Sequence, residues 1–203
     1  MIKTIIFDIG NVLADFNYTG CFKHYTSDEE TYYKMVQATV MSPVWNEFDK
    51  GVWSDEEILQ GFIDNDASIE RELRNMFMNL KDIIRQRDYA IPWIQELKQR
   101  GYQVFVLSNF PKRIYEIHRE DEMRFMEVVD GGILSYREQL VKPDPKIYHL
   151  LMKRYHLAPE ECLFMDDRKE NVLAARKVGW HAIQFFTKEK AVEELEMITK
   201  QIK

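Results

Sequence analysis

Cysteine is scarce in this sequence, which has only Cys21 and Cys162 among its 203 residues. The two lie far apart and lack the paired spacing of zinc sites and redox motifs, which argues against both kinds of site. So few cysteines fit a reducing cytoplasmic setting. The sequence also lacks a basic start followed by a long apolar stretch, and no apolar run is long enough to cross a bilayer. We therefore expect a cytoplasmic protein that has neither a signal peptide nor a membrane partner.

Positive charge is in deficit as well. The chain has 28 Lys and Arg residues against 34 Asp and Glu residues, which gives a net charge of −6. Because nucleic-acid binding needs a basic surface, we expect no nucleic-acid partner. A negative protein also repels a phosphorylated ligand at long range, so any phosphate site in it needs local positive charge.

Apolar residues, by contrast, are plentiful enough for a core. Hydrophobic residues make up 45% of the chain and charged residues 31%, a balance that argues against wholesale disorder. A length of 203 residues accommodates one domain, or one domain with a sizeable insertion.

The most informative stretch lies near the amino terminus. Thr4 to Phe7 is a short apolar run rich in β-branched and aromatic residues, and Asp8 and Gly10-Asn11 follow it. This pattern predicts a buried strand with a carboxylate at its end. Ligands of open α/β sheets bind beyond the carboxyl ends of the strands, so Asp8 is a candidate functional residue. Taken alone, Asp8 could also be a turn or helix-cap residue, and Gly-Asn a plain hairpin turn.

After Phe16 the pattern changes. From Asn17 to Tyr89 there are no apolar β runs, only helix-like segments. Capping-box spacing at Ser27 to Glu30 and at Ser54 to Glu57 predicts two helix starts. One face of a further predicted helix, from Ser68 to Leu80, gathers Ile69, Leu73, Met76, Phe77 and Leu80. We therefore predict a helical cap domain at residues 17–89, inserted into an α/β core domain made of residues 1–16 and 90–203.

From Ile91 onward, helices alternate with strands. We predict helices at 91–100, from Pro111, from Lys142-Pro143-Asp144-Pro145 onward, through Asn171 to Lys177 and from about Lys188, strands at 102–107, 162–165 and 180–186, and a short turn at Gly131-Gly132. This alternation implies a mostly parallel sheet. The predicted fold class is α/β, with a Rossmann-like three-layer core and an inserted α-helical cap.

Polar residues stand at the ends of three predicted strands, namely Asp8, the pair Ser108-Asn109 and the pair Asp166-Asp167. In a parallel sheet these ends converge along one edge. Carboxylates that gather there repel one another, and a divalent cation would compensate that repulsion. Ser108, Asn109 and Lys142 add neutral and positive donors suited to phosphate oxygens. Singly, each of these residues has a structural explanation, as a helix cap or a solvated lysine.

Four segments together resemble the motifs of the haloacid dehalogenase-like (HAD) hydrolase superfamily. Phe7 to Leu13 resembles motif I, Leu107 to Asn109 motif II, Lys142 to Tyr148 the region of motif III, and Phe164 to Asn171 motif IV. The helical segment is similar to the α-helical cap of the family's first cap class. Within the superfamily, the sequence looks most like the Phe-Asp-x-Gly-Asn branch, which includes sugar-phosphate phosphatases such as α-glucose-1-phosphate phosphatase.

The resemblance implies a nucleophile and a metal site. Asp8 would attack phosphorus and form an aspartyl-phosphate that water then hydrolyses. Mg²⁺ would be held by Asp8, the backbone carbonyl of Gly10 and Asp167. Asp166 would be a further ligand or would lie just behind the ligands. The metal would offset the repulsion between the nucleophile and the phosphate.

The resemblance also implies a phosphate site. Ser108 and the backbone amide of Asn109 would donate hydrogen bonds to phosphate oxygens. Lys142 would pair with both Asp8 and the phosphate, and Asn171 would orient Lys142 or the acidic pair. The implied partner is a small phosphorylated molecule, and we expect a monomer or a homodimer.

One position departs from the family pattern. Many phosphatases of this family carry a second Asp two residues after the nucleophile, which protonates the leaving alcohol and then activates water; here that residue is Gly10. Asp15, His24 or a water could substitute for it. An enzyme without this acid should turn over aryl and anomeric phosphates faster than primary alkyl phosphates. The departure affects the rate and the range of leaving groups more than the type of reaction.

Three alternatives to a phosphatase stay open at this point. A metal-independent 2-haloacid dehalogenase would also use Asp8 without a second Asp, although the pair Asp166-Asp167 favours a metal-dependent phosphatase. A phosphonatase would need a cap lysine, for which Lys23, Lys34 and Lys50 are available. The third alternative is a phosphometabolite-binding protein with little turnover. Candidates for lining a specificity pocket in the cap are Tyr18, Phe22, His24, Trp45, Phe48 and Lys50.

Overall fold

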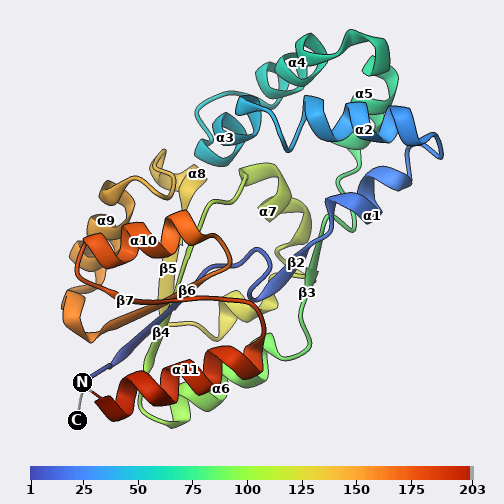
Figure 1. Cartoon of the computed structure of the whole chain (residues 1–203). Coiled ribbons are helices and arrows are strands. Elements are labelled where there is room, and N and C mark those ends of the chain that lie inside the picture. The colour runs from blue at the N-terminus through green and yellow to red at the C-terminus, as the bar shows by residue number, and fades with distance from the viewer. Residues whose placement is uncertain (202–203) are drawn as a thin grey trace.

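The computed structural model describes residues 1–201. Within this range, a parallel five-stranded sheet has the strand order β5-β4-β1-β6-β7 (Figure 1). Its strands are β1 (Thr4–Phe7), β4 (Gln103–Ser108), β5 (Gly131–Leu134), β6 (Cys162–Asp166) and β7 (His181–Gln184). The α/β fold with a mostly parallel, Rossmann-like sheet is therefore confirmed.

Helices cover both faces of this sheet and make a three-layer core. Helices α6 (Ala90–Gln99) and α11 (Lys188–Gln201) lie on one face, and α9 (Pro145–Tyr155) and α10 (Lys169–Lys177) on the other (Figure 1). Strand β1 is buried on both faces because its apolar residues alternate between the two layers. Phe7 packs against Trp93 of α6 with ring centroids 4.8 Å apart. Ile6 belongs to a second apolar cluster together with Tyr148 of α9.

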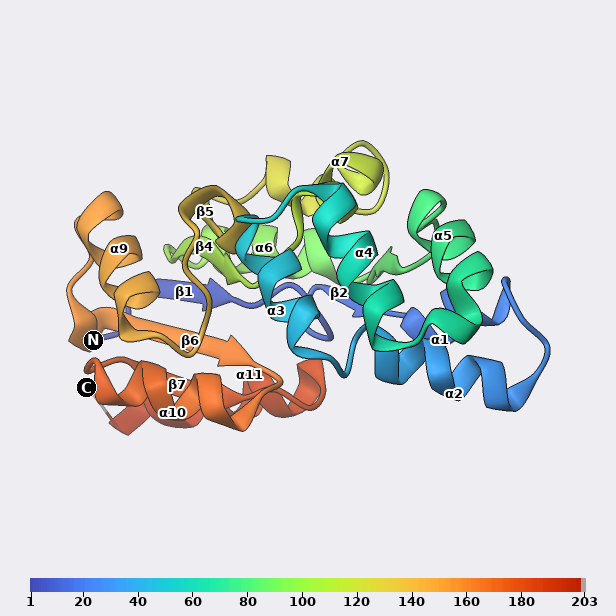
Figure 2. The same cartoon turned by 90° about the horizontal axis from the view of Figure 1, so that it is seen from above.

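Five helices form a separate group beyond the carboxyl ends of the strands (Figures 1 and 2). These cap helices are α1 (Tyr18–Lys23), α2 (Glu29–Ala38), α3 (Pro43–Lys50), α4 (Asp55–Asn65) and α5 (Glu70–Met78), the last preceded by a 3₁₀ turn at Ala67–Ile69. Helix α3 packs on α8 (Ser135–Glu138) of the core, where the Ser135 hydroxyl donates to the Asp49 carbonyl oxygen. Helix α7 (Lys112–His118) follows β4.

One of the two predicted capping boxes is confirmed. The Ser54 hydroxyl accepts a hydrogen bond from the Glu57 N–H at the start of α4, and the Glu57 carboxylate accepts one from the Ser54 N–H. At the start of α2 the prediction is wrong, because Asp28 rather than Ser27 is the N-cap and accepts from the Thr31 N–H at 2.8 Å. Asp is as good an N-cap as Ser, so two adjacent candidates compete and sequence spacing does not decide between them.

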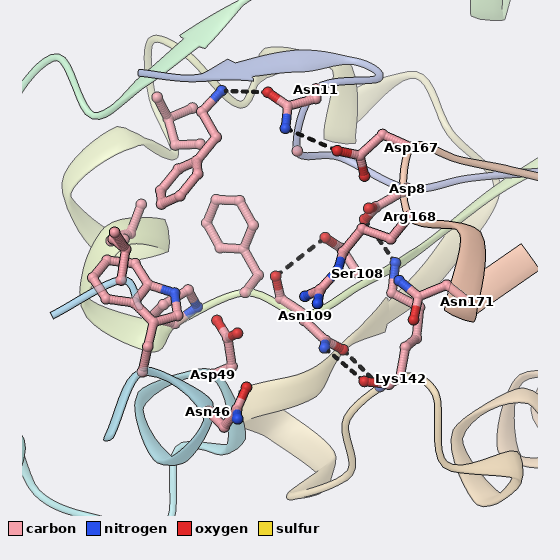
Figure 3. Close-up of a pocket in the computed structure, with 18 of the residues that line it drawn as sticks. Asp8, Asn11, Asn46, Asp49, Ser108, Asn109, Lys142, Asp167, Arg168 and Asn171 are labelled. Atoms are coloured by element: carbon pink, nitrogen blue, oxygen red, sulfur yellow. Dashed lines mark hydrogen bonds and ion pairs between the residues drawn. The ribbon is translucent and has the colours of Figure 1, made fainter. Parts of the chain in front are cut away.

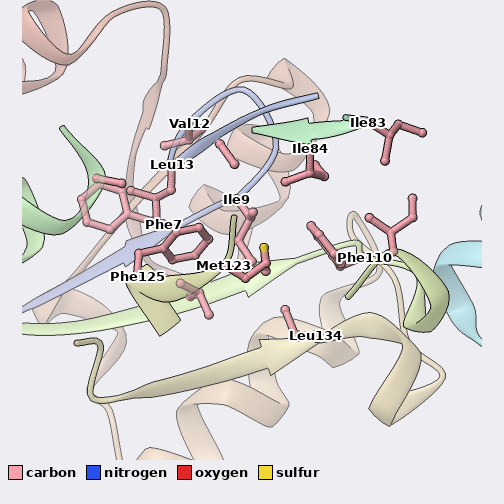
Figure 4. Packing of buried hydrophobic residues seen from close by; sticks show 14 of the residues in the cluster. Phe7, Ile9, Val12, Leu13, Ile83, Ile84, Phe110, Met123, Phe125 and Leu134 are labelled. Atoms are coloured by element: carbon pink, nitrogen blue, oxygen red, sulfur yellow. The ribbon is translucent and has the colours of Figure 1, made fainter. Parts of the chain in front are cut away.

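The chain crosses between the sheet and the cap helices through a two-stranded antiparallel ribbon. Its strands are β2 (Ala14–Phe16) and β3 (Ile84–Gln86), paired in the register Ala14–Gln86. The prediction of helices alone between residues 17 and 89 is therefore wrong at β3, a strand too short to show a period-two pattern. Ile84 is buried in the apolar cluster that runs from the sheet toward the cap (Figure 4). The division into a core of residues 1–16 and 90–203 and a cap of residues 17–89 stays a prediction.

A second correction concerns Gly131-Gly132, which lies in strand β5 and not in a turn. A Cβ atom at Gly132 would lie 2.3 Å from Val106 Cγ2 and 2.5 Å from the Val106 carbonyl oxygen of β4. Only glycine fits so close to the neighbouring strand. The two residues look like a turn in the sequence because close strand packing and turns select for the same residue.

Between residues 1 and 201, no helix combines the length and the apolar character that a membrane crossing requires.

Candidate active site

The predicted strand-end residues meet at one edge of the sheet. Strand β1 lies between β4 and β6, so Asp8, Ser108 and Asp166 come from three adjacent strand ends. The Asp8 N–H donates to the Met165 carbonyl oxygen at 2.9 Å, which continues the β1–β6 pairing into the site. A cavity of about 490 Å³ opens over this edge, between the sheet and the cap helices (Figure 3). We call it the active-site cavity.

Lys142 lies at the floor of the cavity between two carboxylates. Its ammonium is 2.9 Å from Asp8 Oδ1 and 2.6 Å from Asp166 Oδ2, and only 4% of the residue is exposed. Burial by itself lowers the pKa of the Lys142 ammonium, but the charges of Asp166 and Asp8 outweigh burial and raise that pKa above its ordinary value. The site therefore holds a fixed positive charge, the feature that a phosphate site in this negative protein requires.

Two asparagines hold this arrangement in place. The Asn109 side chain accepts from the Lys142 N–H at 2.7 Å and donates to the Lys142 carbonyl oxygen at 3.0 Å, so it fixes the backbone that carries the ammonium. Asn171 Nδ2 donates to both oxygens of Asp166, at 3.1 and 3.0 Å. Of the two roles expected for Asn171, the structure favours orienting the acidic pair. The Arg168 N–H also donates to Asp166, whose carboxylate is fully buried and has a donor at each oxygen.

The three predicted acidic residues form one cluster. Asp8, Asp166 and Asp167 each offer an oxygen, and these oxygens all lie within 4.8 Å of one another. Burial raises the pKa of the Asp8 carboxyl to about 7; Lys142 opposes this effect, and the other two carboxylates reinforce it. Burial also raises the pKa of Asp167, whose Oδ2 accepts from Asn11 Nδ2 at 2.9 Å. Carboxylates that repel one another at this range, with little exposure to water, fit a hard divalent cation.

The cap and the ribbon of β2 and β3 contribute a mainly apolar wall. The cavity is lined on this side by Phe16, Val40, Met41, Ser42, Pro43, Trp45, Asn46, Asp49 and Ile84. Among the cap residues proposed from the sequence, Trp45 lines the cavity. Lys50 instead pairs with Glu47 at 2.9 Å. The remaining candidates, which are not lining residues in the described part of the chain, are Tyr18, Phe22, His24 and Phe48.

Sequence reasoning missed three polar residues of the cap-side wall, Ser42, Asn46 and Asp49. The acidic one is Asp49, near the carboxyl end of α3. It is 8% exposed, and burial, together with the nearby charge of Asp8, raises the pKa of its carboxyl to about 8. A signal was available, because Asp49 follows Trp45 by four residues and so lies on the same helix face. Asp15, proposed from the sequence as a substitute acid, pairs instead with Arg87 at 2.8 Å and does not line the cavity as described.

The family follows from a match along most of the chain. The model of the haloacid dehalogenase-like hydrolases matches residues 2–179, a range that contains every site residue described above. The chain belongs to this family. This chain is therefore an enzyme of the hydrolase class. The cavity at the strand ends is its candidate active site.

Curated relatives of this HAD-like hydrolase include phosphatases. It is 26% identical to sesquiterpene phosphatase astK of Aspergillus oryzae over 178 residues, 87% of this chain and 86% of that protein. It is 25% identical to D-ribitol-5-phosphate phosphatase of Bacteroides thetaiotaomicron over 198 residues, 91% of this chain and 92% of that protein. Some relatives are longer, and the chain covers only 19% of acyl-CoA dehydrogenase family member 10 of Mus musculus. The narrower resemblance to the Phe-Asp-x-Gly-Asn branch stays a prediction.

Solved structures with this fold include a HAD family enzyme with bound magnesium and phosphate and a haloacid dehalogenase. The HAD family enzyme bt-2542 of Bacteroides thetaiotaomicron, in complex with magnesium and inorganic phosphate, has a TM-score of 0.71 at 17% identity, covering 93% of this chain and 96% of that one. L-2-haloacid dehalogenase of Xanthobacter autotrophicus has a TM-score of 0.67 at 17% identity, covering 97% and 83%. The fold of this HAD-like hydrolase therefore does not distinguish phosphoryl transfer from dehalogenation. The residues of the site have to distinguish these two reactions.

Proposed function

We propose that this HAD-like hydrolase is a Mg²⁺-dependent phosphatase that acts on a small phosphorylated metabolite through an aspartyl-phosphate intermediate. The observation that carries the proposal is the placement of the buried Lys142 ammonium against Asp8, beside the cluster that Asp8 forms with Asp166 and Asp167. A nucleophile, a fixed cation and a divalent-metal site then share one cavity, which is the combination that phosphoryl transfer needs.

The metal ligands in this proposal are Asp8, the carbonyl oxygen of Gly10 and Asp167. Asn11 donates to Asp167 Oδ2, and no hydrogen bond within residues 1–201 reaches Asp167 Oδ1. Because the oxygens of Asp166 already accept from Lys142 and Asn171, we assign Asp166 to fixing the lysine behind the ligands. Bound Mg²⁺ would neutralise charge on the phosphate and the carboxylates.

The residues of the chain itself carry the phosphoryl transfer. An oxygen of Asp8 attacks phosphorus in line with the leaving group, and Lys142 neutralises charge on the phosphate oxygens. The backbone N–H of Asn109 and the Ser108 hydroxyl donate to the same oxygens. The Ser108 hydroxyl is available for this, since its contact within the protein, to the Asn109 carbonyl oxygen, is long at 3.4 Å. Asn109 also keeps Lys142 in register through the hydrogen bonds of its side chain.

For the leaving group, we propose a sugar or sugar alcohol. A cavity of about 490 Å³ has room for a molecule of this size. The aromatic surface of Trp45 suits the C–H faces of a sugar, and Asn46 and Asp49 offer partners for its hydroxyl groups. The relationship to a D-ribitol-5-phosphate phosphatase supports this class of substrate.

A release assay tests the proposal. The protein is incubated with a panel of phosphorylated metabolites and, separately, with 2-haloacids, each with Mg²⁺ and with excess chelator, and free phosphate and halide are measured. We expect phosphate release that requires Mg²⁺. Halide release that persists in chelator would replace the proposal with a metal-independent dehalogenase. Binding of phosphorylated metabolites without any release would replace it with a binding protein.

A further inference from the structure

The proposed reaction needs a proton donor that motif I does not supply. When the bond between phosphorus and the leaving oxygen breaks, that oxygen must gain a proton unless it is already a weak base. Gly10 has no side chain to provide it. Asp15 is held by Arg87 with half of its side chain exposed, and neither Asp15 nor His24 is among the cavity residues that the structure describes.

A carboxyl group does enter the cavity from the cap side, opposite the strand ends. Asp49 projects from α3 beside Asn46, facing the Ser108 and Asn109 side of the site (Figure 3). The residue is 8% exposed, yet within residues 1–201 no hydrogen bond or salt bridge joins its carboxylate to another group. In this range, the side-chain atoms that are both inaccessible to water and without a hydrogen-bond partner are His118 Nδ1 and Trp180 Nε1. The Asp49 oxygens are not among these atoms although they have no partner, so they are accessible from the cavity that Asp49 lines.

The backbone around Asp49 is fixed firmly against the core. Its carbonyl oxygen accepts from the Ser135 hydroxyl of α8, and that hydroxyl in turn accepts from the Phe110 N–H at 2.8 Å. Gly51, which ends α3, sits so close to Tyr136 that a Cβ atom there would lie 2.8 Å from Tyr136 Cβ. The end of α3 is thus held on the core segments beside the phosphate site, which sets the Asp49 carboxyl at a defined place in the cavity.

We propose that Asp49 is the general acid and base of the reaction and replaces the carboxyl group that Gly10 lacks. This inference rests on the proposed phosphatase function.

In the first step, an oxygen of Asp8 forms a bond to phosphorus while the bond from phosphorus to the leaving oxygen breaks. The leaving oxygen keeps the electron pair and takes the proton of the Asp49 carboxyl, so the alcohol departs neutral and Asp49 is left as a carboxylate. In the second step, Asp49 takes a proton from water, whose oxygen bonds to phosphorus as the bond to Asp8 breaks. Hydrogen phosphate leaves, and both carboxyl groups return to their starting forms.

The charges around Asp49 suit this cycle. Its pKa of about 8 keeps the carboxyl protonated at neutral pH, the form needed for the first step. Burial is the main cause, the charge of Asp8 adds to it, and the positive charges of Lys142 and Arg168 act in the opposite direction. An exposed carboxyl would be ionised at this pH and unable to donate.

The test compares leaving groups. Phosphate release is measured with Mg²⁺ on a series of aryl phosphates, from nitrophenyl phosphate to phenyl phosphate, and on an alkyl phosphate. Asp49→Asn keeps the shape and removes the proton. We expect kcat/KM of this variant to fall roughly 10²–10⁴-fold on the alkyl phosphate and hardly at all on nitrophenyl phosphate, whose leaving group needs no proton. Glu47→Gln makes the same change two residues away on α3, outside the cavity lining, and should leave the series unchanged.

Each outcome decides the assignment. If Asp49→Asn loses the same factor on every leaving group, or loses nothing, Asp49 is not the acid although the enzyme is still a phosphatase. If the unmodified protein releases phosphate from none of these compounds, the proposed function fails and the assignment fails with it. A urea unfolding curve checks that the variant is folded, and Asp49→Ala, which also removes the carboxyl, provides the comparison if the Asn variant is not.

Discussion

Replacing Lys142 by methionine is the most direct test of how the site is held together. Methionine has nearly the same length as lysine but no charge, so Lys142→Met keeps the packing and removes the ammonium. Asp8 and Asp166, which lie 2.9 and 2.6 Å from that ammonium, would then face each other inside the protein without a counter-ion. Asn171 still donates to Asp166, but a neutral amide does not cancel its charge.

The expected loss of stability is large. Removing one partner of a buried ion pair costs about 3–5 kcal/mol, because the charge that remains is desolvated and unpaired. The total stability of a typical domain is only about 5–15 kcal/mol, so the variant should unfold at a much lower urea concentration. The double variant Lys142→Met/Asp166→Asn removes one of the two unpaired carboxylate charges. It should therefore be more stable than Lys142→Met alone, and a double-mutant cycle that includes Asp166→Asn should give an interaction energy of about 0.5–3 kcal/mol.

Urea unfolding at pH 7 in chelator measures both effects, since no metal then substitutes for the lysine. The slope of unfolding free energy against urea should not change, which makes the midpoints comparable. The loss should shrink as the pH falls, because protonated carboxyls no longer need a counter-ion. A loss below about 1 kcal/mol at pH 7, or a double variant no more stable than the single one, would show that this ion pair does not hold the site.

Four further outcomes are expected. Asp8→Asn should abolish phosphate release while the protein stays folded, because Asp166 still pairs with Lys142 at 2.6 Å; substantial turnover by a pure sample would remove Asp8 from the nucleophile role. Asp167→Ala should weaken Mg²⁺ binding sharply in calorimetry by removing a hard oxygen ligand, and unchanged binding would contradict the ligand set. Because the Asp49 pKa is raised from 3.8 to about 8, the folded state binds more protons than the unfolded state between these values, and this contribution to stability falls as pH rises. Asp49→Asn should accordingly gain in stability relative to the unmodified protein from pH 5 to pH 8 in urea unfolding without metal, and a constant difference would contradict the buried carboxyl. Adding Gly10→Asp to Asp49→Asn should restore turnover of alkyl phosphates, since a Cβ atom at Gly10 meets nothing within 4 Å; no gain on alkyl phosphates would show that position 10 cannot supply the acid.

The core and the floor of the site could be predicted from the sequence because their patterns are local. Runs such as Thr4–Phe7 and Cys162–Asp166 are apolar along their whole length, which marks strands covered on both faces. Parallel pairing then requires that the residues after them meet at one edge, and Asp8, Ser108 and Asp166 do so. Lys142 is a candidate donor from the sequence, but its pairing with Asp8 is implied by the family resemblance alone, since no local pattern distinguishes a buried lysine from a solvated one.

The features that the sequence did not indicate depend on contacts between distant segments. Strand β3 exists because Ile84–Gln86 pairs with Ala14–Phe16, and Gly132 is in a strand because Val106 lies against it. Asp49 is a cavity residue only because α3 rests on α8, a contact between residues that are far apart in the chain. In the sequence itself, the spacing of four residues from Trp45 is what sets Asp49 apart from the other acidic residues, and that spacing does not show that the helix face lines a cavity. The location of the protein and its oligomeric state stay predictions.

The ribbon of β2 and β3 has a consequence for how this family can diversify. Since Ala14 pairs with Gln86, the cap leaves and re-enters the core at adjacent points, and a different cap could be grafted there without moving β1 or β4. In an enzyme whose acid follows its nucleophile in motif I, such an exchange would alter substrate choice and spare the chemistry. If Asp49 is the acid, replacing the cap of this chain would remove the proton donor together with the specificity pocket. Cap and catalytic centre would then have to evolve together, unless Gly10 first became an aspartate.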